Sequence, residues 1–126
     1  YQYNAWYNLS TFYIKKRDFN QAIWALEFTL AVSEKHLMAH QEIGDCFLEI
    51  ENWDKAEEHF NEVLRIDEDN PDALIGIAES SEGREDFELA FDRYKSIADS
   101  DAFHAEAWYG MAVVREKQER YDECLP

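Results

Sequence analysis

Residues 37–70, LMAHQEIGDCFLEIENWDKAEEHFNEVLRIDEDN, decide the fold, because the chain on either side repeats their pattern at an offset of 34 residues without a gap. When the repeats are aligned, one set of equivalent positions, or column, holds alanine at 5, 39, 73 and 107. Further columns hold aliphatic residues at 9, 43, 77 and 111, small residues at 10, 44, 78 and 112, and aromatic residues at 19, 53, 87 and 121. A period of this length is typical of proteins that stack one structural unit repeatedly.

Each unit is expected to form two helices joined by a short turn. In the first unit Trp6, Leu9 and Tyr13 have the spacing of one helix face, and Ala22 and Leu26 begin a second stripe. Short polar segments separate the two stripes in successive units, at residues 15–18, 50–52 and 84–86. Polar or acidic residues that suit a helix start follow, at Asp18 or Asn20, Asn52 or Asp54, and Asp86 or Glu88.

A single helical hairpin cannot bury both of its apolar stripes, so neighbouring units must stack into a solenoid with a concave and a convex face. The units span residues 3–36, 37–70, 71–104 and, in part, 105–126. Pro71 suits the first turn of the helix that opens the third unit. In the fourth unit the second helix is expected to begin near Tyr121 and to contain Pro126. We therefore expect the chain to be a single-domain segment of a longer array.

This pattern resembles the tetratricopeptide repeat family, whose signature is W-x2-L-G-x2-Y in the first helix and A-x3-F in the second. Trp6, Leu9 and Tyr13 match it in the first unit, and Ala56 and Phe60 match it in the second. The resemblance implies an all-α, right-handed superhelical solenoid of antiparallel helix pairs that serves as a protein-interaction scaffold. The runs at 5–9 and 107–111 are similar to the repeats of bacterial members of the family.

Two features of the repeat bear on packing between helices. The small column, with Gly44 and Ala78 among its members, is expected to let the two helices of a pair approach closely. Ser81 and Arg115 stand where the signature has the last aromatic residue of the first helix. We expect these two departures to weaken packing locally.

The composition limits the choice of partners. The chain has 126 residues and a net charge of −16, from 28 Asp and Glu against 12 Lys and Arg. This charge excludes nucleic acid and anionic membranes as expected partners, and no stretch is apolar enough to insert into a bilayer. Counted per unit, the net charges are +1, −9, −6 and −2.

Cys46 and Cys124 do not have the spacing of a disulfide framework, which favours a reducing, cytoplasmic location.

In the tetratricopeptide repeat family the first helix of each pair lines the concave face, and the resemblance implies that a partner peptide would bind there. The expected contacts are Tyr7, Thr11, Gln41, Glu42, Asp45, Asp72, Ile75, Glu79, Glu82 and Tyr109; Leu48, Glu106 and Val113 share the face. Acids mixed with apolar side chains suit a basic segment of another protein that carries apolar anchors. Some members of the family bind the C-terminal carboxylate of chaperones through Lys, Asn and Arg, which the matching positions here lack.

A second candidate surface lies outside this face. Trp24 and Phe28 are one turn apart where other units carry polar residues, and Trp108 and Met111 belong to the incomplete fourth unit. These four residues indicate an interface, so self-assembly into a homo-oligomer is an alternative function. A preceding repeat or the N-terminal tyrosines could instead cover the Trp24 face. A third alternative is an accessory repeat domain of a larger enzyme or sensor.

No arrangement in the sequence favours catalysis, a metal or a cofactor. His36 and His40 have the spacing of a helical metal pair, but they straddle two units and no third ligand lies nearby in the sequence. The acids at 67–70 begin like a calcium loop, but Asp72 and Ala78 replace its glycine and its bidentate glutamate. A nucleophile elbow and a glycine-rich phosphate loop are both lacking. We therefore expect neither enzymatic activity nor a bound metal or cofactor.

Overall fold

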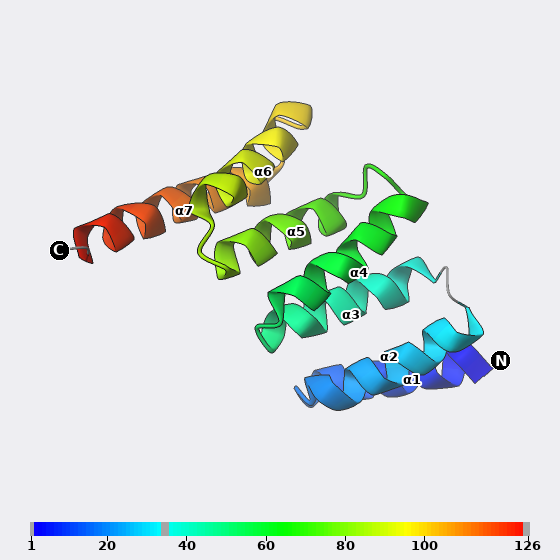
Figure 1. Ribbon diagram of the computed structural model, residues 1–126. Helices are drawn as coiled ribbons and strands as arrows, with labels where there is room; N and C mark the ends of the chain where they lie inside the picture. Colours follow the sequence, from blue (N-terminus) through cyan, green and yellow to red (C-terminus); the bar gives the residue numbers. More distant parts are fainter. Residues whose placement is uncertain (1, 34–35, 125–126) are drawn as a thin grey trace.

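The computed structural model describes residues 2–33 and 36–124, with side chains described for residues 5–33 and 36–120. Within these ranges the chain forms seven α-helices and no strand. The helices are α1 (Gln2–Lys15), α2 (Phe19–Val32), α3 (Leu37–Glu49), α4 (Trp53–Ile66), α5 (Pro71–Gly83), α6 (Phe87–Ser100) and α7 (Ala105–Cys124). Successive helices run antiparallel, and their pairs stack as a right-handed superhelical solenoid (Figure 1). The expected all-α fold class is confirmed.

The turn inside each of the first three helix pairs has one conformation. The turn residue two positions after the end of each first helix has a left-handed backbone with φ between 60° and 65°, at Arg17, Glu51 and Glu85. The residues that follow cap the second helices by accepting a backbone N–H, at Asp18, Asn52 and Asp86. These caps settle the alternatives that the sequence left open, and Pro71 lies in the first turn of α5 as expected.

Helix α7 differs from this pattern. It continues without a turn from Ala105 to Cys124, so the expected start of another helix near Tyr121 is wrong. The cap position of the earlier pairs is held here by Arg120, which cannot accept a backbone N–H. Arg120 instead pairs with Glu116 one turn earlier, at 2.6 Å, which supports the continuous helix. Pro126 lies outside the described residues.

The core depends on large side chains of the second helices wedged against glycines of the first helices. A Cβ atom added at Gly44 or at Gly76 would lie 2.5 Å from the ring of Phe60, so α3 and α5 both approach this ring more closely than any larger residue allows. Gly110 of α7 has the same relation to Tyr94 of α6. The expected close approach at Gly44 is confirmed.

Ser81 and Arg115, where we expected weaker local packing, both make contacts with α6. The Oγ of Ser81 accepts a hydrogen bond of 2.6 Å from Arg93, whose guanidinium also pairs with Glu57 of the preceding helix pair. Arg115 lies with its guanidinium 3.7 Å from the centre of the Phe91 ring. An arginine side chain therefore connects the first helix to α6 at each of these two positions, and the local weakening of packing stays a prediction.

We predict that Glu85→Gly stabilises the protein. Glu85 holds φ = 65°, a conformation that costs a residue with a Cβ about 1 kcal/mol and costs glycine almost nothing. The free energy of unfolding in urea should therefore rise by up to about 1 kcal/mol. Glu85→Ala removes the same carboxylate but keeps the strain, and an equal gain for this control would contradict the explanation.

We predict that Gly76→Ala destabilises the protein by about 2 kcal/mol, although alanine is the better helix former by about 1 kcal/mol. The added methyl group would overlap the Phe60 ring. Urea unfolding of Gly76→Ala, Phe60→Leu and the double variant measures the coupling. The smaller leucine should relieve the clash, so strictly additive effects would argue against it.

Candidate functional site

The concave face of the solenoid contains a groove of about 790 Å³, formed mainly by α3, α5 and α7. Its lining comprises Asp45, Leu48, Glu49, Glu51, Trp53, Ile75, Glu79, Glu82, Gly83, Tyr94, Glu106, Tyr109, Gly110, Val113 and Lys117. The first helices of successive pairs supply most of these side chains, because stacking places those helices next to one another. We call this feature the acidic groove, for the carboxylates in this lining.

Negative charge dominates the acidic groove. Six of its lining residues are carboxylates, whereas Lys117 is the only cation among the described residues that line it. Lys117 forms an ion pair with Glu82, and Glu49 pairs with Arg17 at 3.3 Å. No described cation pairs with the other four carboxylates, which are Asp45, Glu51, Glu79 and Glu106. The groove therefore holds an excess of uncompensated negative charge.

This excess changes how the groove carboxylates ionise. Asp45 reaches solvent, but it lies in the hollow of the groove, and desolvation followed by repulsion from Glu79, Asp72, Glu42 and Glu49 raises its pKa to about 7. Desolvation and neighbouring carboxylates also raise the pKa of Glu79. Both groups would be stabilised in their ionised form by a cation placed among them.

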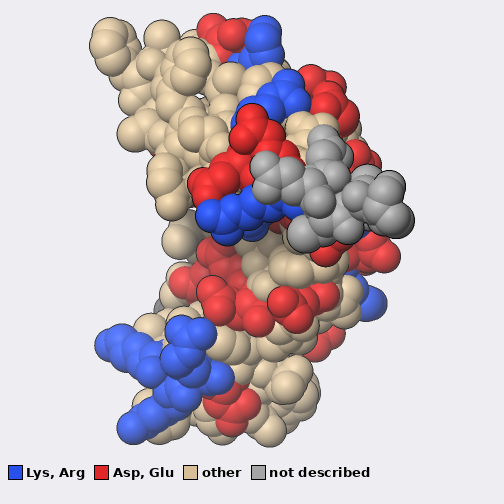
Figure 2. Space-filling model, turned by 90° about the vertical axis from the view of Figure 1, so that its left-hand side faces the viewer, with Lys and Arg blue, Asp and Glu red and all other residues tan. Residues whose placement is uncertain are grey.

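The space-filling view shows how charge is distributed along the stack (Figure 2). Acidic side chains spread over the middle of the molecule, in agreement with the charge count of the sequence. Basic side chains gather at the lower end, over α1 and α2, where the described Lys and Arg residues are 15–17. The middle and the lower end of the stack therefore present different charge to a partner.

Apolar surface is present between the carboxylates. Leu48 of α3 and Val113 of α7 are partly buried along the groove, and the Tyr109 ring is 73% exposed. Tyr94 contributes its hydroxyl, which donates a hydrogen bond of 3.1 Å to Glu82. An exposed aromatic ring next to aliphatic side chains can receive an apolar anchor of a peptide.

Half of the expected contact residues line the acidic groove. These are Asp45, Ile75, Glu79, Glu82 and Tyr109. Ile75 is only 6% exposed and belongs to the core cluster around Tyr94, so it serves mainly as packing rather than as a contact surface. Gln41 is also buried, with 9% of its surface exposed and its Oε1 without a hydrogen-bond partner in the described part of the chain.

Four further expected contacts, in α1, α3 and α5, lie outside the groove lining. Tyr7 donates a hydrogen bond of 3.0 Å to Glu42, which joins α1 to α3, and burial followed by the charge of Glu42 raises the Tyr7 pKa to about 12. Burial also raises the pKa of Glu42, against the opposing effect of this hydrogen bond. Thr11 donates to the carbonyl of Tyr7 within its own helix, and Asp72 is exposed in the first turn of α5. None of these four side chains lines the acidic groove.

Several lining residues were not among the expected contacts. Glu51 lies in the α3–α4 turn, and Trp53 is the first residue of α4. Glu49 and Lys117 share one column of the 34-residue repeat. Glu49 and Glu51 lie at or just after the end of α3, a position that a search restricted to one helix face passes over, whereas Lys117 lies within α7.

The residues considered as an interface form two separate exposed regions. Trp24 and Phe28 are 45% and 40% exposed, and Trp6 joins them through a stacked contact with Phe28 at 4.5 Å between ring centres. Trp108 is exposed at the other end of the stack, with its indole N–H bonded to a backbone carbonyl. Met111 packs against the core cluster around Tyr94, so it contributes little surface.

The two histidines with metal-pair spacing make separate contacts. The Nδ1 of His36 accepts the backbone N–H of Ala39 and caps α3, whereas His40 lies 3.2 Å from His59 through their Nδ1 atoms. Across the described residues, no group of three or more His, Cys, Asp or Glu is placed to hold a metal ion.

Burial, followed by the charge of Asp45, raises the pKa of the Cys46 thiol to about 12, which disfavours the reactive thiolate. No described helix combines the length and hydrophobicity needed to cross a membrane.

Comparison with known proteins gives one family. A family model described as tetratricopeptide repeat matches residues 4–71. The chain is 25% identical over 118 residues to the BBSome complex member BBS4 homolog of Drosophila melanogaster, which covers 93% of this chain and 24% of that protein. The chain thus spans about a quarter of the length of this relative.

Solved structures with low sequence identity share the fold. The first TPR domain of human RPAP3 superposes with a TM-score of 0.83 at 10% identity, covering 98% of both chains. The second TPR domain of human RPAP3, solved in complex with the HSP70 peptide SGPTIEEVD, superposes with a TM-score of 0.81 at 11% identity, covering 90% of this chain and 95% of that one. At these identities the likeness concerns the fold alone.

We predict that Asp45→Asn stabilises the protein in a pH-dependent manner. The folded pKa of about 7 lies above the value of about 3.9 in an unfolded chain, so ionisation opposes folding. This cost develops as pH rises from about 4 to 7 and is complete above 7. The substitution should therefore raise the free energy of unfolding by about 1 kcal/mol or less at pH 8, because solvent screens the exposed side chain.

The same substitution should have no effect near pH 4, where Asp45 is protonated in the folded protein. Urea unfolding at both pH values measures the difference. Asp92→Asn, which removes an exposed carboxylate outside the groove, is the matched control. A gain at pH 8 that is equal for both variants would contradict the role of the groove.

Proposed function

The chain belongs to the tetratricopeptide repeat family, and from this premise we propose that it is a non-enzymatic protein-interaction scaffold whose acidic groove holds a basic segment of a partner protein. In this proposal its repeats are residues 3–36, 37–70 and 71–104, with a partial repeat at 105–126. The proposed location of the scaffold is the cytoplasm. The observation that carries the proposal is the set of four groove carboxylates that no described cation pairs with.

Electrostatics favours a cationic occupant. Asp45 and Glu79 are partly desolvated and repel each other in the free protein. A Lys or Arg side chain between them would replace this repulsion with two attractions, and Arg could pair with a carboxylate through two parallel hydrogen bonds. Binding would lower the pKa of Asp45, so affinity for a basic peptide should rise as pH increases toward 8. Charge of one sign along the groove would also accelerate association at low salt.

Apolar contacts supply the second part of the recognition. Leu48 and Val113 form the aliphatic part of the groove, and Tyr109 offers an exposed ring beside them. The volume of about 790 Å³ lies within the range of about 300–1,000 Å³ found for ligand pockets. A segment with apolar anchors spaced between Lys or Arg residues would therefore fill the groove and neutralise it.

The peptide bound by the second TPR domain of human RPAP3 has the opposite charge pattern. That peptide, SGPTIEEVD, ends in acidic residues. The acidic groove would repel such a sequence, because its lining carries six carboxylates and one lysine among the described residues. We propose that the two proteins use one fold for partners of opposite charge.

Self-association is a second candidate function. It is favoured by the aromatic cluster of Trp6, Trp24 and Phe28, in which Trp24 and Phe28 are exposed, Phe28 stacks on Trp6, and Trp24 meets both of these rings edge to face. Aromatic residues that are partly exposed and held rigidly are typical of protein interfaces. Sedimentation of the native chain and of Trp24→Ala distinguishes this function, because a monomer at all concentrations removes it.

We predict that a fluorescein-labelled peptide of sequence KLRKFLKR binds the native protein more tightly than the matched acidic peptide ELEEFLEE, because only the first complements the groove. The variant Asp45→Lys with Glu79→Lys should weaken binding of the basic peptide at least about tenfold, since it replaces two attractions by repulsions. Fluorescence anisotropy at several salt concentrations and pH values measures both effects.

The control is Glu58→Lys with Asp92→Lys, which changes the net charge equally on the second helices, outside the groove. It should weaken binding by no more than about threefold through the long-range field. Preference for the acidic peptide, or equal losses in the two double variants, would overturn the proposed function.

A further inference from the structure

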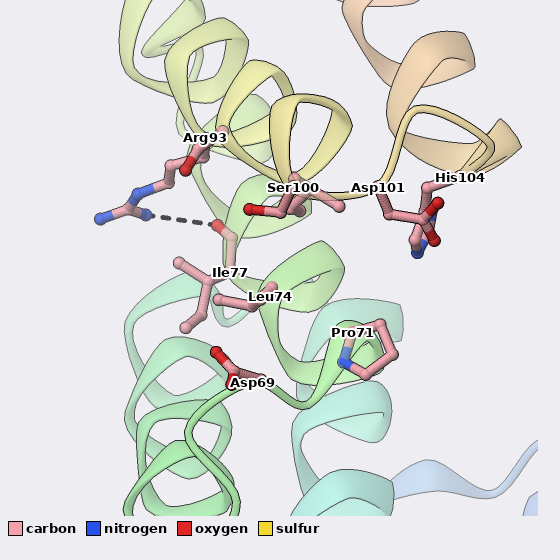
Figure 3. Close-up of a pocket in the computed structure, with 10 residues that line it drawn as sticks. Asp69, Pro71, Leu74, Ile77, Arg93, Ser100, Asp101 and His104 are labelled. Atoms are coloured by element: carbon pink, nitrogen blue, oxygen red, sulfur yellow. Dashed lines mark hydrogen bonds between the residues drawn. The ribbon is translucent and has the colours of Figure 1, made fainter.

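A second cavity, of about 600 Å³, lies between α5 and α6, on the side of the connections that precede and follow this helix pair (Figure 3). We call it the third-pair cavity. Leu74, Ile77 and Ile97 give it an apolar floor, and Ser96 and Ser100 supply hydroxyl groups. None of its lining residues belongs to the acidic groove.

The repeat explains why this space is open. The position of Leu74 is held by Trp6 in the first pair and by His40 in the second, and the position of Ser96 is held by Phe28 in the first. In the first pair Trp6 and Phe28 stack on each other at 4.5 Å between ring centres. The third pair has the smaller Leu74 and Ser96 at these positions, so it lacks the Trp6 and Phe28 rings of the first pair. At the equivalent positions of the first pair, aromatic rings occupy the space that these smaller side chains leave open.

The one arginine that lines the third-pair cavity is occupied. Figure 3 shows the guanidinium of Arg93 at one side, directed to the carbonyl oxygen of Ile77 at 3.3 Å. The same nitrogen pairs with Glu57 and donates to Ser81 at 2.6 Å. The positive charge of Arg93 is therefore neutralised within the protein and is not available to an anionic ligand.

Two carboxylates remain at the mouth of the cavity. Asp69 comes from the α4–α5 connection and Asp101 from the α6–α7 connection, and Figure 3 shows them on different sides of the opening. Both are exposed, and neither forms an ion pair with any residue that the structure describes. The mouth therefore favours a cation, whereas the floor favours an apolar group.

We propose that the third-pair cavity is a second binding site, which takes an aromatic side chain flanked by a basic residue from a partner protein. The ring packs on Leu74, Ile77 and Ile97, and the ammonium or guanidinium group pairs with Asp69 or Asp101. This site does not depend on the acidic groove. Two separate sites would let the scaffold hold two segments of one partner, with a gain in affinity set by the length of the chain between them.

The probe is tryptamine, which carries an indole ring and an ammonium group, and it is compared with indole-3-propionate, which carries the same ring and a carboxylate. In ¹H–¹⁵N correlation spectra of the ¹⁵N-labelled chain, tryptamine should shift the amides of Leu74, Ile97 and Ser100 in a saturable manner. Indole-3-propionate should bind at least about tenfold more weakly, because Asp69 and Asp101 repel its charge.

Leu74→Trp restores the residue of the first pair and should fill the cavity, so tryptamine should no longer shift these amides. Ser96→Phe fills the same space from α6 and serves where the first variant does not fold. Asp45→Asn, in the acidic groove, should leave the affinity for tryptamine unchanged.

Three results would overturn the second site. The first is that no saturable shift occurs at these amides in the native chain. The second is that both indoles bind equally well, and the third is that the shifts persist when the cavity is filled. Shifts confined to Glu79 and Tyr109 would assign tryptamine to the acidic groove, and they would refute the third-pair cavity while supporting the proposed function.

Discussion

The close approach of glycines to aromatic rings sets how the second, third and fourth units of the solenoid pack. Phe60 is wedged between Gly44 of its own helix pair and Gly76 of the next, and Tyr94 meets Gly110 in the same way. These contacts hold the first helices of successive pairs side by side on the concave face. The acidic groove exists because these helices are adjacent, so it depends on packing in the core as much as on the residues at its surface.

Carboxylates between the repeats are paired with arginines, whereas several carboxylates in the groove are not. At the junction of the second and third pairs, burial alone would raise the pKa of Glu57, but hydrogen bonds from Arg93 and Arg84 outweigh it and lower the pKa. In the groove, Asp45 and Glu79 have no such partners and their pKa values rise. The protein thus compensates Glu57, which joins two repeats, and leaves four of the six groove carboxylates without a described cationic partner, which favours a cationic ligand.

Much of this could be predicted from the sequence, because a 34-residue period determines both the helices and the face on which each residue lies. The continuous α7 was missed although its signal was present, since Arg120 stands where the earlier pairs carry Asp or Asn. The burial of Ile75 depends on how closely the neighbouring helices pack, and the sequence repeat does not give this distance. Glu51 and Trp53 reach the groove through the path of a turn, and the third-pair cavity arises from the absence of rings.

The central claim is that carboxylates without a cationic partner in the described chain make the acidic groove a site for a basic segment of another protein. The most direct measurement is an NMR titration of the Asp45 side-chain carboxyl in the free protein and in the presence of saturating basic peptide. The account predicts a pKa of about 7 in the free protein and a clearly lower value in the complex. An ordinary aspartate pKa of about 4 in the free protein, or a pKa unchanged by the peptide, would contradict it.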